Sequence, residues 1–160
     1  MTKLSSQQVA DYFNRSYKAV DGLWFMKVEE TYGFDAALEL DNEVWKVMAK
    51  IQARLIKSFL ELGTGSDALL ESLVTKLELE GFKYTAEKNP NGFTITITDC
   101  PWHNLMIKSK REHLAKQVGQ KICTTENNVF ASELDNSIKF TLKSQKCGKS
   151  EHCTLDFVSQ

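Results

Sequence analysis

The first half of the chain repeats apolar residues at the spacing of an α-helix, three or four positions apart. Residues 5–32 carry one such stripe, formed by Val9, Tyr12, Phe13, Tyr17 and Val20. Gly22 precedes the apolar run 23–25, which predicts a buried turn at this point. Gly33 predicts the end of the segment, because glycine is common just past the last residue of a helix.

A second stripe follows a short turn that we predict for residues 35–40. Asp41 can cap a helix there, since its carboxylate can accept hydrogen bonds from the free N–H groups of the first turn. The stripe of this helix consists of Val44, Val47, Met48, Ile51, Leu55, Phe59 and Leu62. Glycines at 63 and 65 predict its end, and a further helix capped by Ser66 is expected to run to Gly81.

The period of the pattern changes to two from residue 82 onward. Apolar and polar residues alternate over 82–87 and over 93–98, and Asn89-Pro90-Asn91-Gly92 between them is a turn sequence. This pattern predicts a β-hairpin with one buried face. Residues 138–142 and 153–157 alternate in the same way and predict a second hairpin.

The segment between the two hairpins reads as helical. Pro101 suits the first turn of a helix, where its missing N–H is not needed. Residues 110–126 predict a longer helix, and residues 127–134 a turn or a short helix.

The order of helices, hairpin, helices and hairpin predicts an α+β fold, in which N-terminal helices pack on a small antiparallel sheet made of two β-hairpins. A chain of 160 residues is long enough for one complete core. We therefore expect a single domain over residues 1–160, with a mainly helical part at 1–81 and a hairpin–helix–hairpin core at 82–160.

Charge and hydropathy exclude some partners. The formal net charge is −1 and no block of basic residues occurs, so nucleic-acid binding through phosphate neutralisation is not expected. No apolar run reaches the roughly 20 residues of a membrane-spanning helix, so no membrane partner is expected. Residues 1–10 are polar and lack the apolar centre of a signal peptide, which predicts a cytoplasmic location. Assembly into a homo-oligomer is left open.

The four cysteines, Cys100, Cys123, Cys147 and Cys153, all lie in the C-terminal part of the chain. In a cytoplasmic protein, cysteines are more typical of metal ligands, nucleophiles or free thiols than of a disulfide framework. Cys147 falls in a polar, glycine-containing loop and is expected to be exposed.

Cys100 stands where the first hairpin meets the helix that begins at Pro101. It is therefore expected at the N-cap, where free N–H groups and the positive helix end favour a thiolate. His103 follows one turn later, and zinc accepts both Cys and His ligands. The pair predicts half of a metal site or an activated nucleophile; a capping Cys beside a surface His is an alternative of equal weight.

Cys123 and Glu126 form a second pair, one helical turn apart on the same face. Glu126 could bind a metal through oxygen or act as a general base on metal-bound water. Cys153 shares the apolar parity of the last strand and could add a third sulfur. The alternative for each cysteine is a small buried apolar residue, and for Glu126 a solvated surface charge.

The same motifs resemble a known family. They are Cys100-Pro101-Trp102, Val118-Gly119, Cys123-Thr124-Thr125-Glu126, Thr141-Leu142, Gly148 and Cys153-Thr154-Leu155-Asp156-Phe157, with residues 21–25 and 29–34 in the N-terminal part. They are similar to the L-2-amino-thiazoline-4-carboxylic acid hydrolase-like family and its uncharacterised relatives. The C-terminal hairpin more loosely resembles 4VR small-molecule-binding domains. The chain has Glu126 where the hydrolases have aspartate, a departure that bears on the substrate more than on the fold.

The resemblance implies a small-molecule hydrolase that opens a thiazoline-carboxylate ring by cleaving a C–N or C–S bond. Glu126 would be the general base and Cys100 a nucleophile in a variant without metal. Cys100, His103, Cys123 and Cys153 would hold a divalent metal, with zinc the first choice. The alternative is a non-catalytic domain that binds a metal or a small molecule as a sensor or carrier. A third interpretation is an α+β domain whose thiols are core residues.

Overall fold

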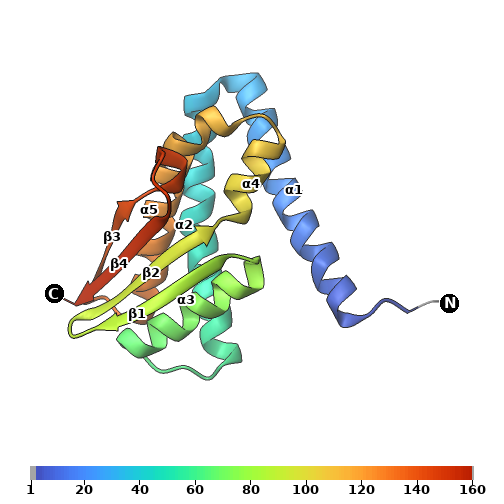
Figure 1. Cartoon of the computed structure of the whole chain (residues 1–160). Coiled ribbons are helices and arrows are strands. Elements are labelled where there is room, and N and C mark those ends of the chain that lie inside the picture. Colours follow the sequence, from blue (N-terminus) through green and yellow to red (C-terminus); the bar gives the residue numbers. More distant parts are fainter. Residues whose placement is uncertain (1–2, 160) are drawn as a thin grey trace. The chain divides into compact units, whose positions relative to one another are not determined.

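The computed structural model describes residues 3–159, so Met1 and Thr2 of the polar segment 1–10 lie outside the described residues. The chain divides into two compact units between Asp41 and Asn42. In chain order, the elements are α1 (Ser6–Tyr32), α2 (Phe34–Phe59), α3 (Ser66–Glu80), β1 (Lys83–Asn89), β2 (Gly92–Asp99), α4 (Pro101–Lys108), the 3-10 turn η1 (Glu112–Leu114), α5 (Ala115–Leu134), β3 (Ile138–Ser144), the 3-10 turn η2 (Lys146–Gly148) and β4 (Cys153–Ser159) (Figure 1).

The first unit consists of α1 and the first turns of α2. A capping box starts α1: the Gln8 backbone N–H donates to Ser5 Oγ, and the Ser5 N–H donates to the Gln8 side chain. Gly33, at φ +86°, ends the helix as predicted. The buried turn predicted after Gly22 is wrong, because α1 continues through this glycine and Trp24 is 67% exposed. A single glycine costs a helix only about 1 kcal/mol, which is too little to break it.

Helix α2 runs without a break from Phe34 to Phe59, so the predicted turn at 35–40 and the separate helix from Asp41 are wrong. No glycine or proline occurs in this range to interrupt the helix. Its buried face within the second unit consists of the apolar residues Trp45, Ala49, Ala53 and Ile56.

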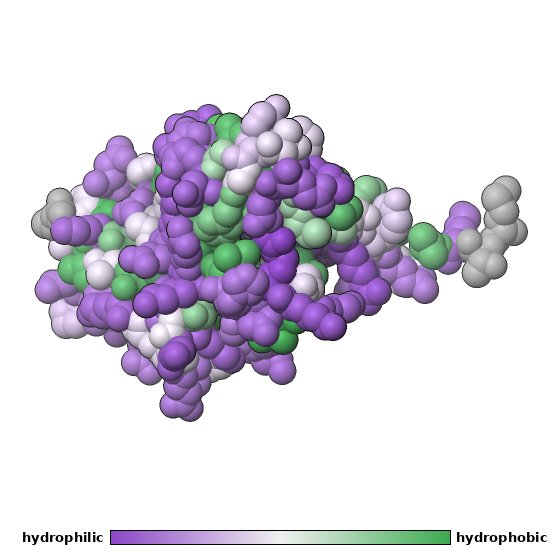
Figure 2. Space-filling view, turned by 90° about the horizontal axis from the view of Figure 1, so that it is seen from above, coloured by the Kyte–Doolittle hydropathy of each residue, from purple (hydrophilic) through white to green (hydrophobic). Residues whose placement is uncertain are grey.

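The predicted apolar stripe of α2 is helical but mostly faces outward; of its members, Met48 and Leu62 are partly buried, and Leu62 lies past the end of α2. Its large side chains Val44, Val47, Ile51, Leu55 and Phe59 are all exposed. Figure 2 shows that hydrophobic residues are exposed among hydrophilic ones on one face of the molecule. Spacing reveals an apolar face, but when a helix has two such faces the spacing does not say which of them is buried.

Helix α3 follows as expected, with Gly65 rather than Ser66 at its N-cap and with Gly81 in the left-handed conformation at its end. Helix α5 differs from the prediction at both ends. It starts at Ala115, after η1, and continues to Leu134. The Asn127 and Asn128 side-chain amides donate to the carbonyls of Cys123 and Thr124, four residues earlier, and so are satisfied inside the helix they were expected to end.

The four strands form one antiparallel sheet in the order β1-β2-β4-β3 (Figure 1). Both hairpins occur where predicted, and β4 of the second hairpin pairs with β2 of the first. The α+β prediction is therefore confirmed. None of the helices in residues 3–159 is long and apolar enough to cross a membrane.

The core of the second unit lies between one face of the sheet and the helices α2, α3 and α5. Its members on the strands alternate with polar residues, as a half-buried sheet requires. They are Phe93, Ile95, Ile97, Ile138, Phe140, Leu155 and Phe157. Phe157 is the centre of this layer, because its ring stacks on Phe93 at 4.8 Å between centroids and contacts Phe140 at 5.1 Å.

We predict that Phe157→Ala lowers the free energy of unfolding by about 3–5 kcal/mol, because it leaves a cavity among close-packed rings. The matched control is Phe59→Ala, which removes the same atoms from a ring that is 75% exposed and should change stability by less than about 0.5 kcal/mol. Urea unfolding of both variants measures the difference. Equal losses from the two variants would contradict the central place of Phe157.

Candidate four-thiol site

Cys100 occupies the N-cap of α4, as predicted. The backbone N–H of His103 donates to Cys100 Sγ at 3.5 Å. Burial nevertheless raises the pKa of Cys100 to about 11, although the backbone N–H groups of His103 and Trp102 act to lower it. The thiolate expected from the N-cap position is therefore not favoured in this state, because desolvation outweighs the helix end.

Cys153 begins β4 and lies opposite Ile97 of β2, packed against the core as its strand parity predicted. Its Sγ accepts a hydrogen bond of 3.2 Å from the backbone N–H of Lys146. The Lys146 side chain in turn donates to the carbonyl of Thr98 at 2.5 Å, two residues before Cys100. One residue of η2 thus ties the start of β4 to the end of β2.

Cys147 was expected to be exposed in a loop, and this prediction is wrong. The residue is partly buried in η2, which folds against α5. Burial raises the pKa of Cys147 to about 12. Polar neighbours in the sequence suggested an exposed loop, but a short loop that closes on a helix buries part of its residues whatever their polarity.

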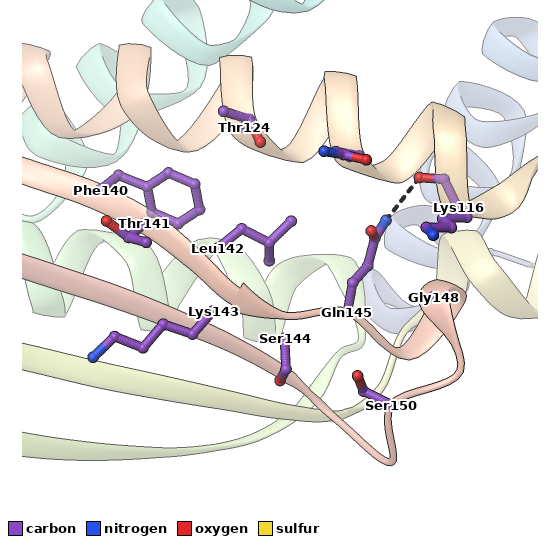
Figure 3. A pocket seen from close by; sticks show the side chains of 11 residues that line it. Lys116, Thr124, Phe140, Thr141, Leu142, Lys143, Ser144, Gln145, Gly148 and Ser150 are labelled. Carbon is purple, nitrogen blue, oxygen red and sulfur yellow. Dashed lines mark hydrogen bonds between the residues drawn. The ribbon is translucent and has the colours of Figure 1, made fainter.

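Gly119 of α5 makes this close approach possible. A Cβ at this position would lie 3.7 Å from Cys147 Sγ and 2.6 Å from Nε2 of Gln145. Gln145 uses this space to donate a hydrogen bond to the carbonyl of Lys116 at 3.1 Å (Figure 3). The absence of a side chain at Gly119 therefore lets η2 pack closely against α5, because any side chain there would force Gln145 to move.

Cys123 lies one helical turn after Gly119 on α5, so it projects from the same face as the contact with Cys147. Burial raises the pKa of Cys123 well above its ordinary value, and the charges of Glu126 and of the other three thiols raise it further.

The four thiols form one group, here called the four-thiol site: Cys100, Cys123, Cys147 and Cys153. All six pairs among them are close enough for the charge of one sulfur to affect the pKa of another. The structure thus brings together three of the predicted metal ligands and adds Cys147. The contact shown for His103 is made by its backbone. In residues 3–159, no three His, Cys, Asp or Glu side chains are arranged to hold a single metal ion as they stand.

Lys76 of α3 forms a buried ion pair with Glu126, the predicted general base, at 2.7 Å between Nζ and Oε1. Nζ also lies 3.2 Å from the carboxylate of Glu80, one turn further along α3. Burial acts to lower the pKa of Lys76, but the two carboxylates outweigh it and the pKa is raised. Burial raises the pKa of Glu126, and Glu80 adds to the effect while Lys76 opposes it.

This charged network extends to the helix that carries Cys100. The indole N–H of Trp102 donates to Glu80 at 3.3 Å, and the Trp102 ring meets Trp45 of α2 edge-on at 5.5 Å. The amide of Gln52, also on α2, donates to Glu80 at 3.1 Å. Glu80 therefore links α2, α3 and α4 beside the four-thiol site.

The sequence analysis missed Lys76 and Glu80, although a signal for them exists. Both fall on the side of α3 that its leucines Leu69, Leu73 and Leu77 bury, at four-residue spacing from each other. Lysine and glutamate are almost never fully buried unless they are paired. Charged residues inside an apolar stripe were therefore a readable sign of an internal ion pair.

A groove lies beside η2, between α5 and β3 (Figure 3). Its volume is about 450 Å³, within the range of small-molecule sites. The wall of the groove includes Thr124 and Leu142. It also includes Gln145, two residues before Cys147, and Gly148, the residue after it. The wall mixes hydroxyl, amide and apolar groups.

The fold and the site define an α+β domain with a central group of thiols. The chain belongs to a family of unknown function (DUF6125), whose pattern matches residues 2–158. No curated protein and no solved structure matches it.

We predict that Lys76→Met lowers the free energy of unfolding by about 3–5 kcal/mol, because it leaves two carboxylates facing each other without their shared cation. The control is Lys88→Met, which breaks the exposed pair between Lys88 and Asp67 and should cost at most about 1 kcal/mol. Chemical unfolding at neutral pH measures both values. A small loss from Lys76→Met would show that the buried pair is not needed for the fold.

Proposed function

We propose that this chain is a metal-binding domain in which the four cysteines supply the ligands. The observation that carries the proposal is that cysteines from four separate elements lie close together. Lys146, next to Cys147, donates its backbone N–H to Cys153 Sγ and its ammonium to the Thr98 carbonyl near Cys100, and Cys147 lies beside Gly119, one helical turn before Cys123. Four thiols brought together without a disulfide framework are the ligand set of zinc and of iron–sulfur centres.

The raised pKa values are consistent with this role. Burial raises the pKa of the Cys100, Cys123 and Cys147 thiols, so these three stay protonated by themselves at neutral pH. A bound cation would invert this balance, because it stabilises the thiolates and displaces their protons. Backbone N–H groups already point at Cys100 and Cys153, where they would stabilise negative sulfur.

The groove beside η2 suggests what such a domain does. Gln145 and Gly148 line the groove. Between them in sequence, Cys147 belongs to the four-thiol site and the Lys146 backbone N–H donates to Cys153 of that site. A ligand in the groove and a metal on the thiols would therefore act on the same short segment. This arrangement supports a non-catalytic sensor or carrier that binds a small molecule and a metal.

The test is the metal content of protein purified without oxygen, measured with a thiol count before and after incubation with Zn²⁺ or with iron and sulfide. We expect one metal centre per chain, lost in Cys147→Ser as fully as in Cys100→Ser. His103→Ala is the matched control and should keep the metal. Retention in Cys147→Ser together with loss in His103→Ala would return His103 to the ligand set. A wild-type chain that takes up neither metal would overturn the proposal.

A second candidate is the hydrolase that the sequence resemblance implies. The observation in its favour is Glu126, whose raised pKa suits a general base and whose charge acts on Cys100 and Cys123. In this reaction Glu126 would take a proton from water as the oxygen adds to the ring carbon between nitrogen and sulfur. The C–S bond would then break, and the sulfur would leave as a thiol.

We expect, for this second candidate, that 2-aminothiazoline-4-carboxylate is consumed by the metal-loaded wild type with release of one new thiol. Glu126→Gln should reduce turnover at least about 100-fold, because it removes the base while keeping the shape of the side chain. Asn128→Ala, a change at an exposed position of α5 two residues away, is the control for general damage to α5. Equal turnover by wild type and Glu126→Gln would exclude Glu126 as the base.

A further inference from the structure

Helix α2 carries apolar side chains on two opposite faces. One face is buried in the core of the second unit. The other face holds five side chains, here called the outer stripe, which are 44–75% exposed and follow each other at intervals of three or four residues. They are Val44, Val47, Ile51, Leu55 and Phe59. A helix that is apolar on both faces is normally covered on both, and a monomer rarely leaves a continuous apolar ridge open to water. The outer stripe therefore needs a surface that covers it.

The charges of α2 indicate which surface that is. Residues 34–45, the first half of the helix, contain only acidic charges, and residues 46–59 contain only basic ones. The acidic residues are Asp35, Glu39, Asp41 and Glu43, and the basic residues are Lys46, Lys50, Arg54 and Lys57. Two copies of such a helix repel each other when they lie parallel, because like halves meet, and attract each other when they lie antiparallel. The charges of α2 are thus complementary to those of a second copy.

This separation of charge exceeds what the helix itself requires. Acidic residues at the start of a helix and basic residues at its end stabilise it through its dipole, but the effect is confined to the first and last turns. Glu43 and Lys50 lie about 2.5 turns from the nearer end of α2. Within the chain, Lys46 pairs with Glu43 and Arg54 pairs with Glu133. Each of these pairs includes an exposed side chain, and such pairs are weak enough to exchange partners.

We propose that the outer stripe is the interface of a homodimer, in which the α2 helices of two copies pack antiparallel across a two-fold axis at Val47. In this register Val47 meets its own counterpart, and Val44 of each copy lies opposite Ile51 of the other. Leu40, which is 52% exposed, lies opposite Leu55 of the second copy. The apolar residues of one copy thus cover those of the other, as a two-fold interface requires.

The charged side of the stripe fits the same register. Glu43, Lys50 and Lys57 recur every seven residues, so they project from one side of the outer stripe. The two-fold axis brings this side of one copy next to the same side of the other. Glu43 of one copy then lies opposite Lys50 of the other, and Lys57 lies opposite the acidic turn that contains Glu39. Each of these contacts between copies is attractive.

The test is the mass of the full chain in solution, measured by light scattering during size-exclusion chromatography and by sedimentation. We expect twice the mass of one chain. Val47→Glu should dissociate the dimer into single chains, because it places two unpaired carboxylates at the centre of an apolar interface.

Val20→Glu is the matched control, because it makes the same substitution at a 68% exposed position of α1. It should leave the dimer intact, and circular dichroism checks that both variants are folded. Dissociation by Val20→Glu but not by Val47→Glu would place the interface on α1 and would overturn the proposal.

Exchange of charges tests the orientation of the helices. Glu43→Lys and Lys50→Glu should each weaken the dimer at least about 10-fold, because each brings like charges together across the interface. The double variant E43K/K50E restores opposite charges and should regain most of the lost affinity. In a parallel dimer these two positions lie at different heights, so the double variant would show no such rescue. Absence of the rescue would therefore overturn the antiparallel arrangement.

The salt dependence of the wild type gives a readout that needs no variant. Raising NaCl from about 0.05 M to about 0.5 M should weaken the antiparallel dimer several-fold, because salt screens exposed ion pairs. A dimer that becomes stronger with salt would reveal like charges across the interface and would overturn the orientation. A wild type that remains a single chain at every measurable concentration would overturn the dimer itself. No cysteine takes part in this interface, so these outcomes are independent of metal uptake.

Discussion

The buried ammonium of Lys76 is the constraint on which the arrangement of the second unit depends. A charge removed from water must be paired, and here it is shared by carboxylates from α3 and α5. The Glu80 carboxylate also accepts hydrogen bonds from Gln52 of α2 and Trp102 of α4. The need to pair the Lys76 charge therefore constrains four helices rather than two. Packing alone would allow these helices to slide or rotate at small cost, whereas an unpaired buried charge would be expensive. The polar network therefore fixes the register of the helices against which the thiols are placed.

The sequence predicted the fold class and most elements, because both depend on local signals. Alternation gave the two hairpins, and Gly33 and Gly81 marked helix ends correctly. The errors arose where one type of residue can take two different structural roles. Aspartate and asparagine can start or end a helix, yet Asn127 bonds back to its own helix and Asp41 lies inside one.

The site was predictable in part for the same reason. Helix spacing and strand parity correctly placed Cys100 at a cap and Cys153 on the core face. Cys147 was missed because its position depends on how η2 folds against Gly119, a contact between segments far apart in sequence. The partner of Glu126 was missed likewise, since Lys76 lies on another helix. Local patterns report the face on which a residue lies, but they do not report what that face meets.

The order of the strands in the sheet determines when the sheet can be completed during synthesis. β4 follows every other element in sequence, yet it occupies an interior place in the sheet, between β2 and β3. During synthesis on the ribosome, the first hairpin must wait with the edge of β2 open, and β3 has no partner strand until β4 emerges. Cys153 belongs to that strand, so the fourth thiol arrives only when the sheet can close. The sheet therefore closes and the fourth thiol joins the group in the same step of synthesis.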